Sequence, residues 1–561
     1  MPPVLSSLFL KGLGAYVTRC QRQFMRKTRE PDGVQLQFLQ GLLQFHRHTV
    51  WGRQWQIGEI RSVDQLRDRI PPSTYADYEP WIERTAAGEP NLLTPESPYY
   101  FCISSGTTGK RKWVPLTRRF QQSMQRANFA SFGFLWQELQ QRGLRFGRSH
   151  AISSAQILGQ TTAGIPYGLA SANSIRSGKL LSRLIFSFPY RIFEIEESLS
   201  RTYLSLLFSM RDPGVRGMTA NFPMLFLRTC QILEQQAESL IADLERGTLA
   251  DWLKISPQQR AQLQQRCFPQ PQRADELRFV LNKAGKLTPK GIWPHLAFVA
   301  TARGGTSDFY FRQFPEYIGD TPIFGGVYGC SEATYSLFSE VNQDSSILAL
   351  ESGFFEFVPI DQWNQLMPQT LLPSEVKVGA LYRILVTNYA GLYRYDIGDV
   401  VEVVGFYEKT PRIIFRYRQG GQISSTSEKT TESHVIQVMS RLQAQFGVTL
   451  DDFCVTLSAT EIPAHYLVNL ELIPGSEINN PQTFLQAFDQ ELQQENPHYQ
   501  VMRRMDVPPP RLRILAPGSF EQLRQRLIQA GASEIQLKVT HVSEDRQYLA
   551  DLPIVAEIQL A

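Results

Sequence analysis

The sequence lacks the cysteine patterns of a disulfide-rich or zinc-binding protein. Its six cysteines are scattered, with no Cys-x-x-Cys pair and no Cys/His spacing of the zinc type. We therefore expect free thiols, which are usual in a reducing compartment. The N-terminal stretch has neither the basic n-region nor the cleavage site of a secretory signal peptide. No stretch reaches the roughly 20 apolar residues that a membrane span needs. The sequence thus predicts a cytoplasmic protein with no membrane span.

Charge of one sign is also scarce. The 57 Lys and Arg residues and 53 Asp and Glu residues leave a net charge of +4 over 561 residues. Nucleic acids and anionic membranes bind clustered cations, so this slight excess predicts neither as a main partner. Hydrophobic residues make up 42% of the chain and charged residues 20%, which is typical of a packed globular protein. At roughly 100–200 residues per domain, the length predicts two to four structural units.

Helical patterns alternate with short strands, which is typical of an α/β fold. Residues 1–95 are predicted to be mainly helical. Further helices are expected over 119–142, 192–210 and 223–245. A strand over 99–103 leads into a loop rich in Ser, Thr and Gly.

A second set of patterns follows after residue 379. Residues 379–406 predict a three-strand meander with turns at Asn388 to Gly391 and at Gly398-Asp399. The stretch from Arg418 to Glu432 is polar and has neither helical nor strand periodicity. Beyond it, strands are expected over 453–458, 466–473 and 535–542, and helices over 483–495 and 520–530. We therefore predict a body over 1–418, a hinge linker over 419–432 and a small α+β lid domain over 433–561.

The loop after the first predicted strand carries the strongest chemical signal. It reads Ser104-Ser105-Gly106-Thr107-Thr108-Gly109-Lys110-Arg111-Lys112. Four hydroxyls and two glycines leave backbone N–H groups free to converge on an anion, and three cations follow. A Walker A loop would need a glycine at Ser104 and a hydroxyl at Arg111, so a P-loop NTPase is disfavoured. We predict a phosphate-binding loop of another kind.

A second motif, Tyr328-Gly329-Cys330-Ser331-Glu332-Ala333, has two interpretations. It nearly matches the Gly-x-Ser-x-Gly elbow of serine hydrolases, so Ser331 is a candidate nucleophile. Its base would come from His434, His465, His498 or His541. Alternatively, Tyr328 is an aromatic platform for a base and Glu332 a ligand for Mg²⁺, which prefers oxygen. A serine hydrolase would have no use for the phosphate-binding loop predicted at Ser104 to Lys112.

The third motif is Tyr393-Arg394-Tyr395-Asp396-Ile397-Gly398-Asp399. A carboxylate at a glycine turn between strands can accept hydrogen bonds from two ribose hydroxyls, although an Asp after Gly is usually only a turn residue.

Together the three motifs resemble those of the GH3 family of acyl acid amido synthetases, in the adenylate-forming superfamily. Their order and wide spacing agree with the family. Ser427-Glu428-Lys429-Thr430 resembles the family's hinge segment, and Gly531 to Lys538 resembles its closing lid motif. The family's Pro-Arg shortly after the lid lysine is replaced here by Thr540-His541. The resemblance implies a large multi-subdomain N-terminal adenylate-forming body and a small mobile C-terminal α+β lid.

The resemblance also implies the site residues. The nucleotide would be bound by Ser104, Ser105, Gly106, Thr107, Thr108, Gly109, Lys112, Tyr328, Gly329, Ser331, Asp399 and Arg418. Glu332 would bind Mg²⁺, and Lys429 and Lys538 would be the catalytic lysines.

The activity implied is ATP-dependent adenylation of a small carboxylic acid, followed by transfer of the acyl group to an amino acid amine. We expect ATP and Mg²⁺ as cofactors and a monomeric protein. Three alternatives stay open: an acyl-CoA ligase, a non-catalytic acid-binding protein on the same fold, and a serine hydrolase that uses Ser331. The sequence names neither the acid nor the amine.

Overall fold

The computed structural model describes residues 3–105, 111–304, 310–418, 421–426, 428–505, 507–530, 534 and 537–560. The chain divides into two compact units. Unit 1 comprises Met1–Ile397 and Val401–Phe415, and unit 2 comprises Gly398–Val400 and Arg416–Ala561. In the described residues, none of the helices combines the length and the apolar character that crossing a membrane requires.

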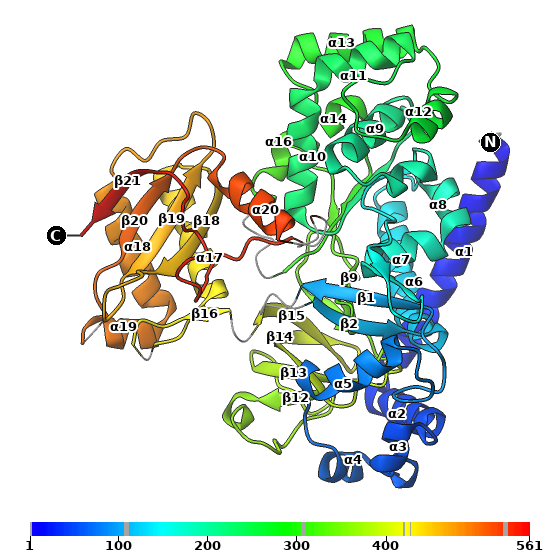
Figure 1. Ribbon diagram of the computed structural model, residues 1–561, viewed down its shortest axis with the longest axis vertical. Helices are drawn as coiled ribbons and strands as arrows, with labels where there is room; N and C mark the ends of the chain where they lie inside the picture. Colours follow the sequence, from blue (N-terminus) through cyan, green and yellow to red (C-terminus); the bar gives the residue numbers. More distant parts are fainter. Residues whose placement is uncertain are drawn as a thin grey trace. The chain divides into compact units, whose positions relative to one another are not determined.

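Unit 1 begins with helices, as the sequence predicts. They are α1 (Pro3–Lys27), α2 (Pro31–His46), α3 (Val50–Gln54), α4 (Val63–Arg69) and α5 (Tyr75–Ala86). The long helix α1 lies along α6 (Arg118–Gln141), as Figure 1 shows. Gly133 of α6 permits this close approach, because a Cβ there would clash with the Val17 backbone. The start of α5 carries a capping box made by Thr74 and Asp77.

A seven-stranded sheet holds two of the three motifs. Its strand order is β12-β13-β14-β15-β11-β10-β9. The bounds are β9 Val327–Gly329, β10 Thr334–Leu337, β11 Ser346–Leu348, β12 Phe354–Pro359, β13 Leu381–Thr387, β14 Tyr395–Tyr407 and β15 Thr410–Arg418. The predicted turn at Gly398-Asp399 is wrong, because β14 runs through both residues while paired with β13 and β15. Gly398 has a φ of +84°, which glycine adopts without strain inside this strand.

Two four-stranded sheets complete unit 1. One has the order β2-β1-β5-β4, with β1 Tyr100–Ser105, β2 Arg111–Leu116, β4 Gly159–Gln160 and β5 Pro166–Gly168. The other is parallel, in the order β3-β6-β7-β8, with β3 Ser149–Ile152, β6 Gly217–Ala220, β7 Phe298–Ala300 and β8 Ile323–Phe324. Parallel strands joined by helices confirm the α/β class.

Further helices in the described part of unit 1 lie between the parallel strands in sequence. They are α7 Ala170–Ser177, α8 Lys179–Ile185, α9 Ser198–Met210, α10 Pro223–Gln235, α11 Ala237–Arg246, α12 Pro257–Gln264, α13 Pro271–Ala284, α14 Pro289–Ile292 and α16 Phe314–Ile318. The helix predicted over 223–245 is two helices, because Gln236 leaves the helical region between them.

Unit 2 is a four-stranded sheet with four helices. Its strand order is β18-β19-β20-β21, with β18 Leu450–Leu457, β19 Tyr466–Leu472, β20 Arg511–Leu515 and β21 Ile554–Gln559. The helices are α17 Glu432–Phe446, α18 Pro481–Glu495, α19 Pro497–Arg503 and α20 Ser519–Gln529. A short pair, β16 (Gln422–Ile423) and β17 (Thr430–Thr431), precedes α17. This arrangement confirms the α+β prediction for the C-terminal part.

The last strand predicted over 535–542 is wrong in its described part, and residues 535 and 536 lie outside the described residues. Residues 537–540 form neither helix nor strand, and the last strand is β21. This segment makes a single isolated bridge to β18, between Val455 and Val542. The backbone N–H of His541 donates to the Glu432 side chain, so it is not available to extend the pairing with β18.

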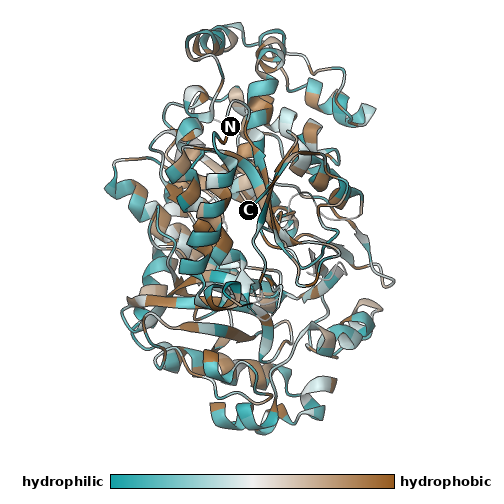
Figure 2. Cartoon of the chain, turned by 90° about the vertical axis from the view of Figure 1, so that its left-hand side faces the viewer, coloured by the Kyte–Doolittle hydropathy of each residue, from teal (hydrophilic) through white to brown (hydrophobic). Residues whose placement is uncertain are grey.

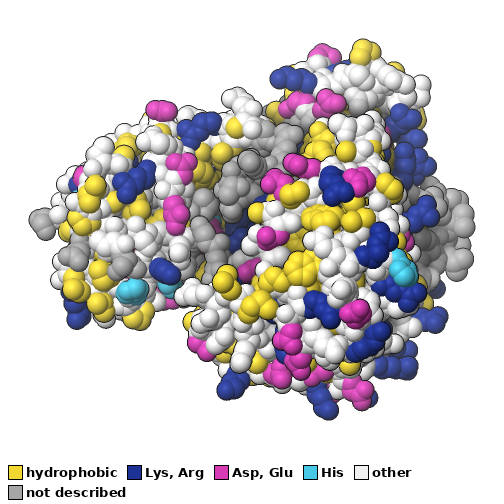
Figure 3. Space-filling model, turned by 60° about the horizontal axis from the view of Figure 1, so that its bottom comes forward, with side chains coloured by type: hydrophobic (Ala, Val, Ile, Leu, Met, Phe, Trp, Pro, Cys, Tyr) yellow, Lys and Arg dark blue, Asp and Glu magenta, His cyan; other side chains and the backbone are white. Residues whose placement is uncertain are grey.

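Hydrophobic residues follow the strands and the inner faces of the helices (Figure 2). In unit 1, the core includes Tyr335, Phe355, Ile384 and Val403, all fully buried. On the face shown in Figure 3, Lys and Arg side chains are interspersed with Asp and Glu. That surface agrees with the nearly balanced charge of the sequence.

Candidate active site

The β1–β2 hairpin fixes both ends of the predicted phosphate loop. The strands pair antiparallel, with Ser104 opposite Lys112 and Ser105 opposite Arg111. Gly106, Thr107, Thr108 and Gly109 lie outside the described residues. The hairpin therefore places Lys112 beside the strand that leads into the loop.

Tyr75, which the sequence analysis missed, supports this hairpin. The Lys112 Nζ lies 5.5 Å from the centre of the Tyr75 ring, a cation–π contact. The Trp113 backbone N–H donates a hydrogen bond of 2.8 Å to the Tyr75 hydroxyl. Burial raises the pKa of Tyr75 to about 12, and the negative charge of Glu332 contributes to the rise. The capping box at Thr74 was the signal in the sequence, because it places Tyr75 at the start of a helix.

Glu332 is a buried carboxylate with an unsatisfied oxygen. Its side chain is 2% exposed, and Oε2 has no hydrogen-bond partner in the described part of the chain. Its charge also acts on Cys102 of β1. Burial raises the pKa of Cys102 to about 12, and the negative charge of Glu332 adds to this rise. Asn388 holds the backbone by donating to the Glu332 carbonyl at 2.7 Å. A buried carboxylate without a partner is costly unless a cation meets it.

These features fit a Mg²⁺ site, which the sequence predicts at Glu332. Mg²⁺ keeps several waters and is usually bound by one or two carboxylates together with substrate phosphates. Within the ranges that the structure describes, no three His, Cys, Asp or Glu residues are grouped to hold a metal by themselves. Glu332 would therefore share the ion with oxygens of the nucleotide.

Tyr328 lies on the strand that leads into a tight turn, and Ser331 lies within that turn, which the Cys330 N–H closes by donating to the Ala333 carbonyl at 2.8 Å. The Tyr328 ring is stacked on Tyr335, with centroids 5.1 Å apart and an interplanar angle of 23°, and it also contacts Phe415 at 5.4 Å. Gly329 is exposed, and a Cβ there would lie 3.0 Å from the Ala333 carbonyl oxygen. Ser331 is buried next to Glu332. A side chain at Gly329 would therefore crowd the turn.

The last residue of the third motif pairs with another predicted nucleotide residue. The Arg418 Nε lies 2.6 Å from the Asp399 Oδ1. Asp399 is 1% exposed, whereas the Arg418 side chain is 39% exposed. The two residues come from the neighbouring strands β14 and β15, and both belong to unit 2.

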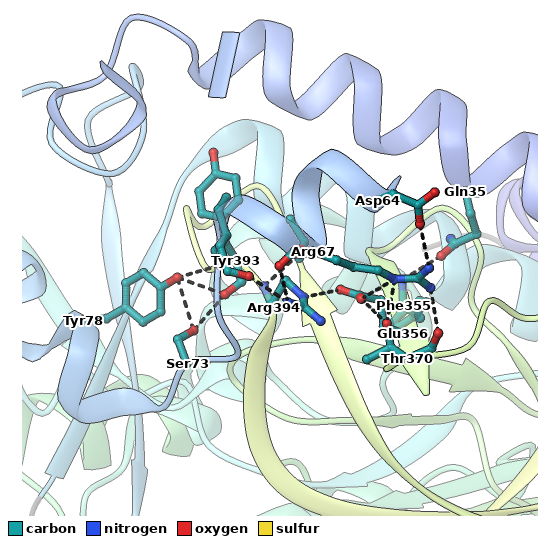
Figure 4. Close-up of polar contacts among 12 residues, drawn as sticks. Gln35, Asp64, Arg67, Ser73, Tyr78, Phe355, Glu356, Thr370, Tyr393 and Arg394 are labelled. Carbon is teal, nitrogen blue, oxygen red and sulfur yellow. Dashed lines mark hydrogen bonds and ion pairs between the residues drawn. The ribbon is translucent and has the colours of Figure 1, made fainter. Parts of the chain in front are cut away.

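The first residues of the same motif belong to the core of unit 1 (Figure 4). Tyr393 stacks on Trp51, with ring centroids 4.2 Å apart, and its backbone carbonyl accepts from the Tyr78 hydroxyl at 3.1 Å. The Arg394 Nε lies 3.0 Å from the Glu356 Oε2, and both side chains are 1% exposed. Figure 4 also shows Arg67 directed at Glu356. This part of the motif is structural.

Two predicted lysines lie in unit 2. The backbone of Lys429 is held because Asn496 donates to its carbonyl at 3.0 Å, while its side chain is exposed. The preceding residue, Glu428, is fully buried and accepts hydrogen bonds from Ser425 N and the Tyr466 hydroxyl. Lys538 Nζ lies 3.7 Å from the Glu432 Oε2. Asn496 and Glu432 carried no recognisable signal in the sequence.

Of the four histidines of the hydrolase interpretation, His498 is exposed, and the other three have other partners. The ring of His434 accepts from Thr431 N at the start of α17, and His465 lies 2.8 Å from the Pro509 carbonyl oxygen. His541 lies between Glu432 and Asp452. A Ser–His hydrogen bond does occur, between His150 and Ser209 at 2.9 Å, but both residues are fully buried. Substrate could not reach that pair.

Comparison with known proteins gives matches along the chain. The GH3 family N-terminal domain matches residues 20–323, the central domain 346–418 and the C-terminal domain 433–547. The 4-substituted benzoates-glutamate ligase GH3.12 of Arabidopsis thaliana is 24% identical over 546 residues, or 92% of this chain and 94% of the ligase. The jasmonoyl-L-amino acid synthetase JAR4 of Nicotiana attenuata is 27% identical over 481 residues, or 80% of each chain.

Solved structures show the same fold. The acyl acid amido synthetase AtGH3.15 in complex with 2,4-DB aligns with a TM-score of 0.86 at 22% identity, covering 97% of this chain and 98% of that one. A 2-hydroxyisobutyryl-CoA ligase aligns with a TM-score of 0.55 at 12% identity, covering 92% and 90%. The fold is therefore that of adenylate-forming enzymes, and with all three of its domains matched in order, the chain belongs to the GH3 family.

Proposed function

We propose that this chain is an ATP-dependent acyl acid amido synthetase, which adenylates a small carboxylic acid and transfers the acyl group to an amino acid. The observation that carries the proposal is the buried Glu332 carboxylate, whose Oε2 has no hydrogen-bond partner among the described residues and whose charge acts on Tyr75, the residue beneath Lys112. The benzoates-glutamate ligase and the jasmonoyl-amino acid synthetase named above act on acids and amino acids. This chain belongs to the same family and has the carboxylates and lysines of the motifs, which supports the same class of reaction for it.

The first half-reaction brings two anions together, because a carboxylate attacks the α-phosphate. Catalysis then depends on spreading negative charge over positive groups and backbone N–H groups. Mg²⁺ bound at Glu332 would neutralise phosphate charge. Lys112, Lys429 and Lys538 supply further positive charge, and pyrophosphate leaves. The loop residues Ser104 to Gly109 are proposed to bind the phosphates.

The remaining site residues bind the nucleoside. The buried Asp399 accepts hydrogen bonds from the ribose hydroxyls, and Arg418 orients its carboxylate. The Tyr328 ring, already supported by Tyr335, offers a flat surface for the adenine. Gly329 and Ser331 also contact the nucleotide on the side of the adenine.

In the second half-reaction, the amine attacks the acyl carbonyl, an amide forms and AMP leaves. Positioning and electrostatic stabilisation suffice, so neither Ser331 nor Cys330 acts as a nucleophile. We further propose residues 419–432 as a hinge between a body over 1–418 and a lid over 433–561. The protein is proposed to be a cytoplasmic monomer, which sedimentation of the purified chain would test.

The experiment is an acid-dependent ATP–pyrophosphate exchange screen over a panel of carboxylic acids. We expect exchange with at least one acid, and amide products by mass spectrometry when pooled amino acids are added. Coenzyme A replaces the amino acids in a parallel reaction, because the fold is shared with an acyl-CoA ligase. Thioester without amide would favour the ligase, and absence of exchange with every acid would argue against adenylation.

A further inference from the structure

Lys538 lies beside a carboxylate that none of the sequence motifs assigns a role. Its Nζ is 3.7 Å from the Oε2 of Glu432, the first residue of α17. The Lys538 side chain is 38% exposed and that of Glu432 is 16% exposed. Ion pairs with one exposed partner are weak, because solvent screens them. The carboxylate can therefore orient the ammonium and still be exchanged for a more highly charged anion.

The other oxygen of Glu432 is held by His541. The backbone N–H of His541 donates to the Glu432 Oε1 at 2.9 Å, and the ring Nδ1 lies 3.3 Å from the same atom. With Oε1 engaged, Oε2 is left facing Lys538. Burial alone would raise the pKa of Glu432, but the charge of Lys538 and the bonds from His541 outweigh it and lower the pKa to about 2. The group is thus a carboxylate at every working pH.

His541 is in turn held from its other side. Its Nε2 lies 3.4 Å from the Asp452 Oδ1, and both side chains are fully buried. Arg524 Nη1 lies 3.5 Å from the second oxygen of Asp452. Burial lowers the pKa of His541, but Asp452 and Glu432 outweigh it, so the net shift is upward. A protonated ring donates from both nitrogens, whereas a neutral ring donates from only one.

The backbone on the C-terminal side of Lys538 is fastened to β18. The His541 carbonyl accepts from Val455 N at 2.8 Å, and the Val455 carbonyl accepts from Ser543 N at 3.1 Å. The anchor lies three residues from Lys538. The residues that hold this lysine therefore come from α17, β18 and the segment 537–543.

We propose that Glu432 and His541 are positioning residues for adenylation: His541 orients the Glu432 carboxylate, which holds the Lys538 ammonium until that ammonium engages the nucleotide. The inference rests on the adenylation role proposed for Lys538. His541 stands where the family motif has an arginine, so this chain uses a titratable group at this position. No covalent step is involved, because one ionic partner is exchanged for another.

The test measures acid-dependent pyrophosphate exchange in Glu432→Gln, His541→Gln, their double variant and Lys538→Ala. We expect Glu432→Gln and His541→Gln each to lower kcat about 5- to 10-fold, with the KM for ATP changed less than about 2-fold. The double variant should be no slower than the slower single variant, because the two residues act through one another. Glu557→Gln, which breaks a pair with Arg513 in the same unit, is the control expected to keep the wild-type rate.

The pH profile of kcat separates positioning from a structural role. As pH rises, His541 loses a proton and with it one of its two donors, so the wild-type kcat should fall. Other groups near this network are Asp451, Cys454, Glu471, Glu521 and Tyr548, of which burial raises the pKa of Asp451 to about 6. The fall above neutral pH should be absent in His541→Gln, and in Glu432→Gln it should move to lower pH.

Three outcomes are decisive. The inference would be overturned if both Glu432→Gln and His541→Gln had the wild-type kcat, or if His541→Gln had the wild-type pH profile. In either case, a slow Lys538→Ala variant would leave the proposed function standing. Wild-type exchange in Lys538→Ala would instead overturn the role of that lysine. Should the buried substitution at His541 prevent folding, as judged by thermal melting, Glu432→Gln alone decides through its kcat and its shifted profile.

Discussion

The Arg418 Nε lies 2.6 Å from the Oδ1 of Asp399, and this pair links the end of β15 to a residue inside the neighbouring strand β14. Asp399 is buried and Arg418 is half-exposed, so the arginine covers the carboxylate on its solvent side. One oxygen of Asp399 is thereby fixed, which orients the carboxylate as an acceptor. The pair makes a direct prediction for nucleotide binding.

Asp399→Asn should raise the Kd for ATP about tenfold, because charge-assisted hydrogen bonds to the ribose become neutral ones and tenfold is about 1.4 kcal/mol. Arg418→Ala should raise the Kd by a smaller factor, since it acts mainly by orienting Asp399. Calorimetric titration with ATP measures both. Arg412→Ala, on the same strand and paired with Glu340, is the matched control. An unchanged Kd in Asp399→Asn would contradict the assigned role.

Glu332→Gln should separate metal use from stability. The substitution removes the charge that Mg²⁺ requires, so the Mg²⁺ concentration for half-maximal exchange should rise about tenfold or more. The free energy of unfolding without ligands should be unchanged or higher, because a buried carboxylate without a partner is costly to the fold. Exchange at varied Mg²⁺ and urea unfolding give the two values. A normal Mg²⁺ dependence together with a destabilised protein would show that Glu332 is structural.

Two groups of unit 2 should make its stability depend on pH in opposite directions. The folded-state pKa of Glu432 is lowered to about 2, so its stabilisation is present above its ordinary pKa near 4.5 and is lost as pH falls toward 2. The folded-state pKa of His541 is raised, so its stabilisation is present below its ordinary value near 6.5 and is lost as pH rises through the folded value. Both contributions are complete between about pH 5 and 6.5. Asp451, whose pKa burial raises to about 6, loses its own stabilisation as pH rises toward 6, in wild type and variants alike.

Hydrogen exchange of α17, corrected for the intrinsic pH dependence of amide exchange, measures this effect. All eight tryptophans lie before residue 364, so their fluorescence reports unit 1 separately. In His541→Gln the loss of protection above pH 6.5 should disappear, and in Glu432→Gln the loss below pH 4.5 should disappear. Identical profiles in wild type and both variants would refute the prediction.

The buried pair between Arg394 and Glu356 should be essential for unit 1. Arg394→Met leaves the buried Glu356 with Arg67, at 3.5 Å, as its remaining charged partner, so it should lower the free energy of unfolding by about 3 kcal/mol. Adding Glu356→Gln should recover part of the loss, because the remaining charge is then removed as well. Urea unfolding followed by tryptophan fluorescence gives the values. Arg84→Ala breaks an exposed pair with Glu89 and should have no measurable effect.

Local patterns predicted most of the secondary structure and the chemical class of the site. The periodicity of residues 118–141, the apolar strand before Ser104 and the helices of unit 2 are encoded by neighbours in sequence, and the structure confirms them. Strand pairing is not local. The Gly398-Asp399 pair has the composition of a turn, yet pairing with β13 and β15 keeps both residues inside β14.

The candidate site shows the same division. Glu332 and Asp399 are named from the residue types of their motifs, and Lys538 is named from the resemblance to the GH3 family. The partners that give these residues their chemistry are far away in the chain: Tyr75 under Lys112, Asn388 behind Glu332, and His541 behind Glu432. The burial of Glu332 depends on the packing of several elements. The sequence by itself therefore determined which chemistry is present, whereas the tertiary structure decided which charges are buried and paired, because both depend on contacts between residues distant in the chain.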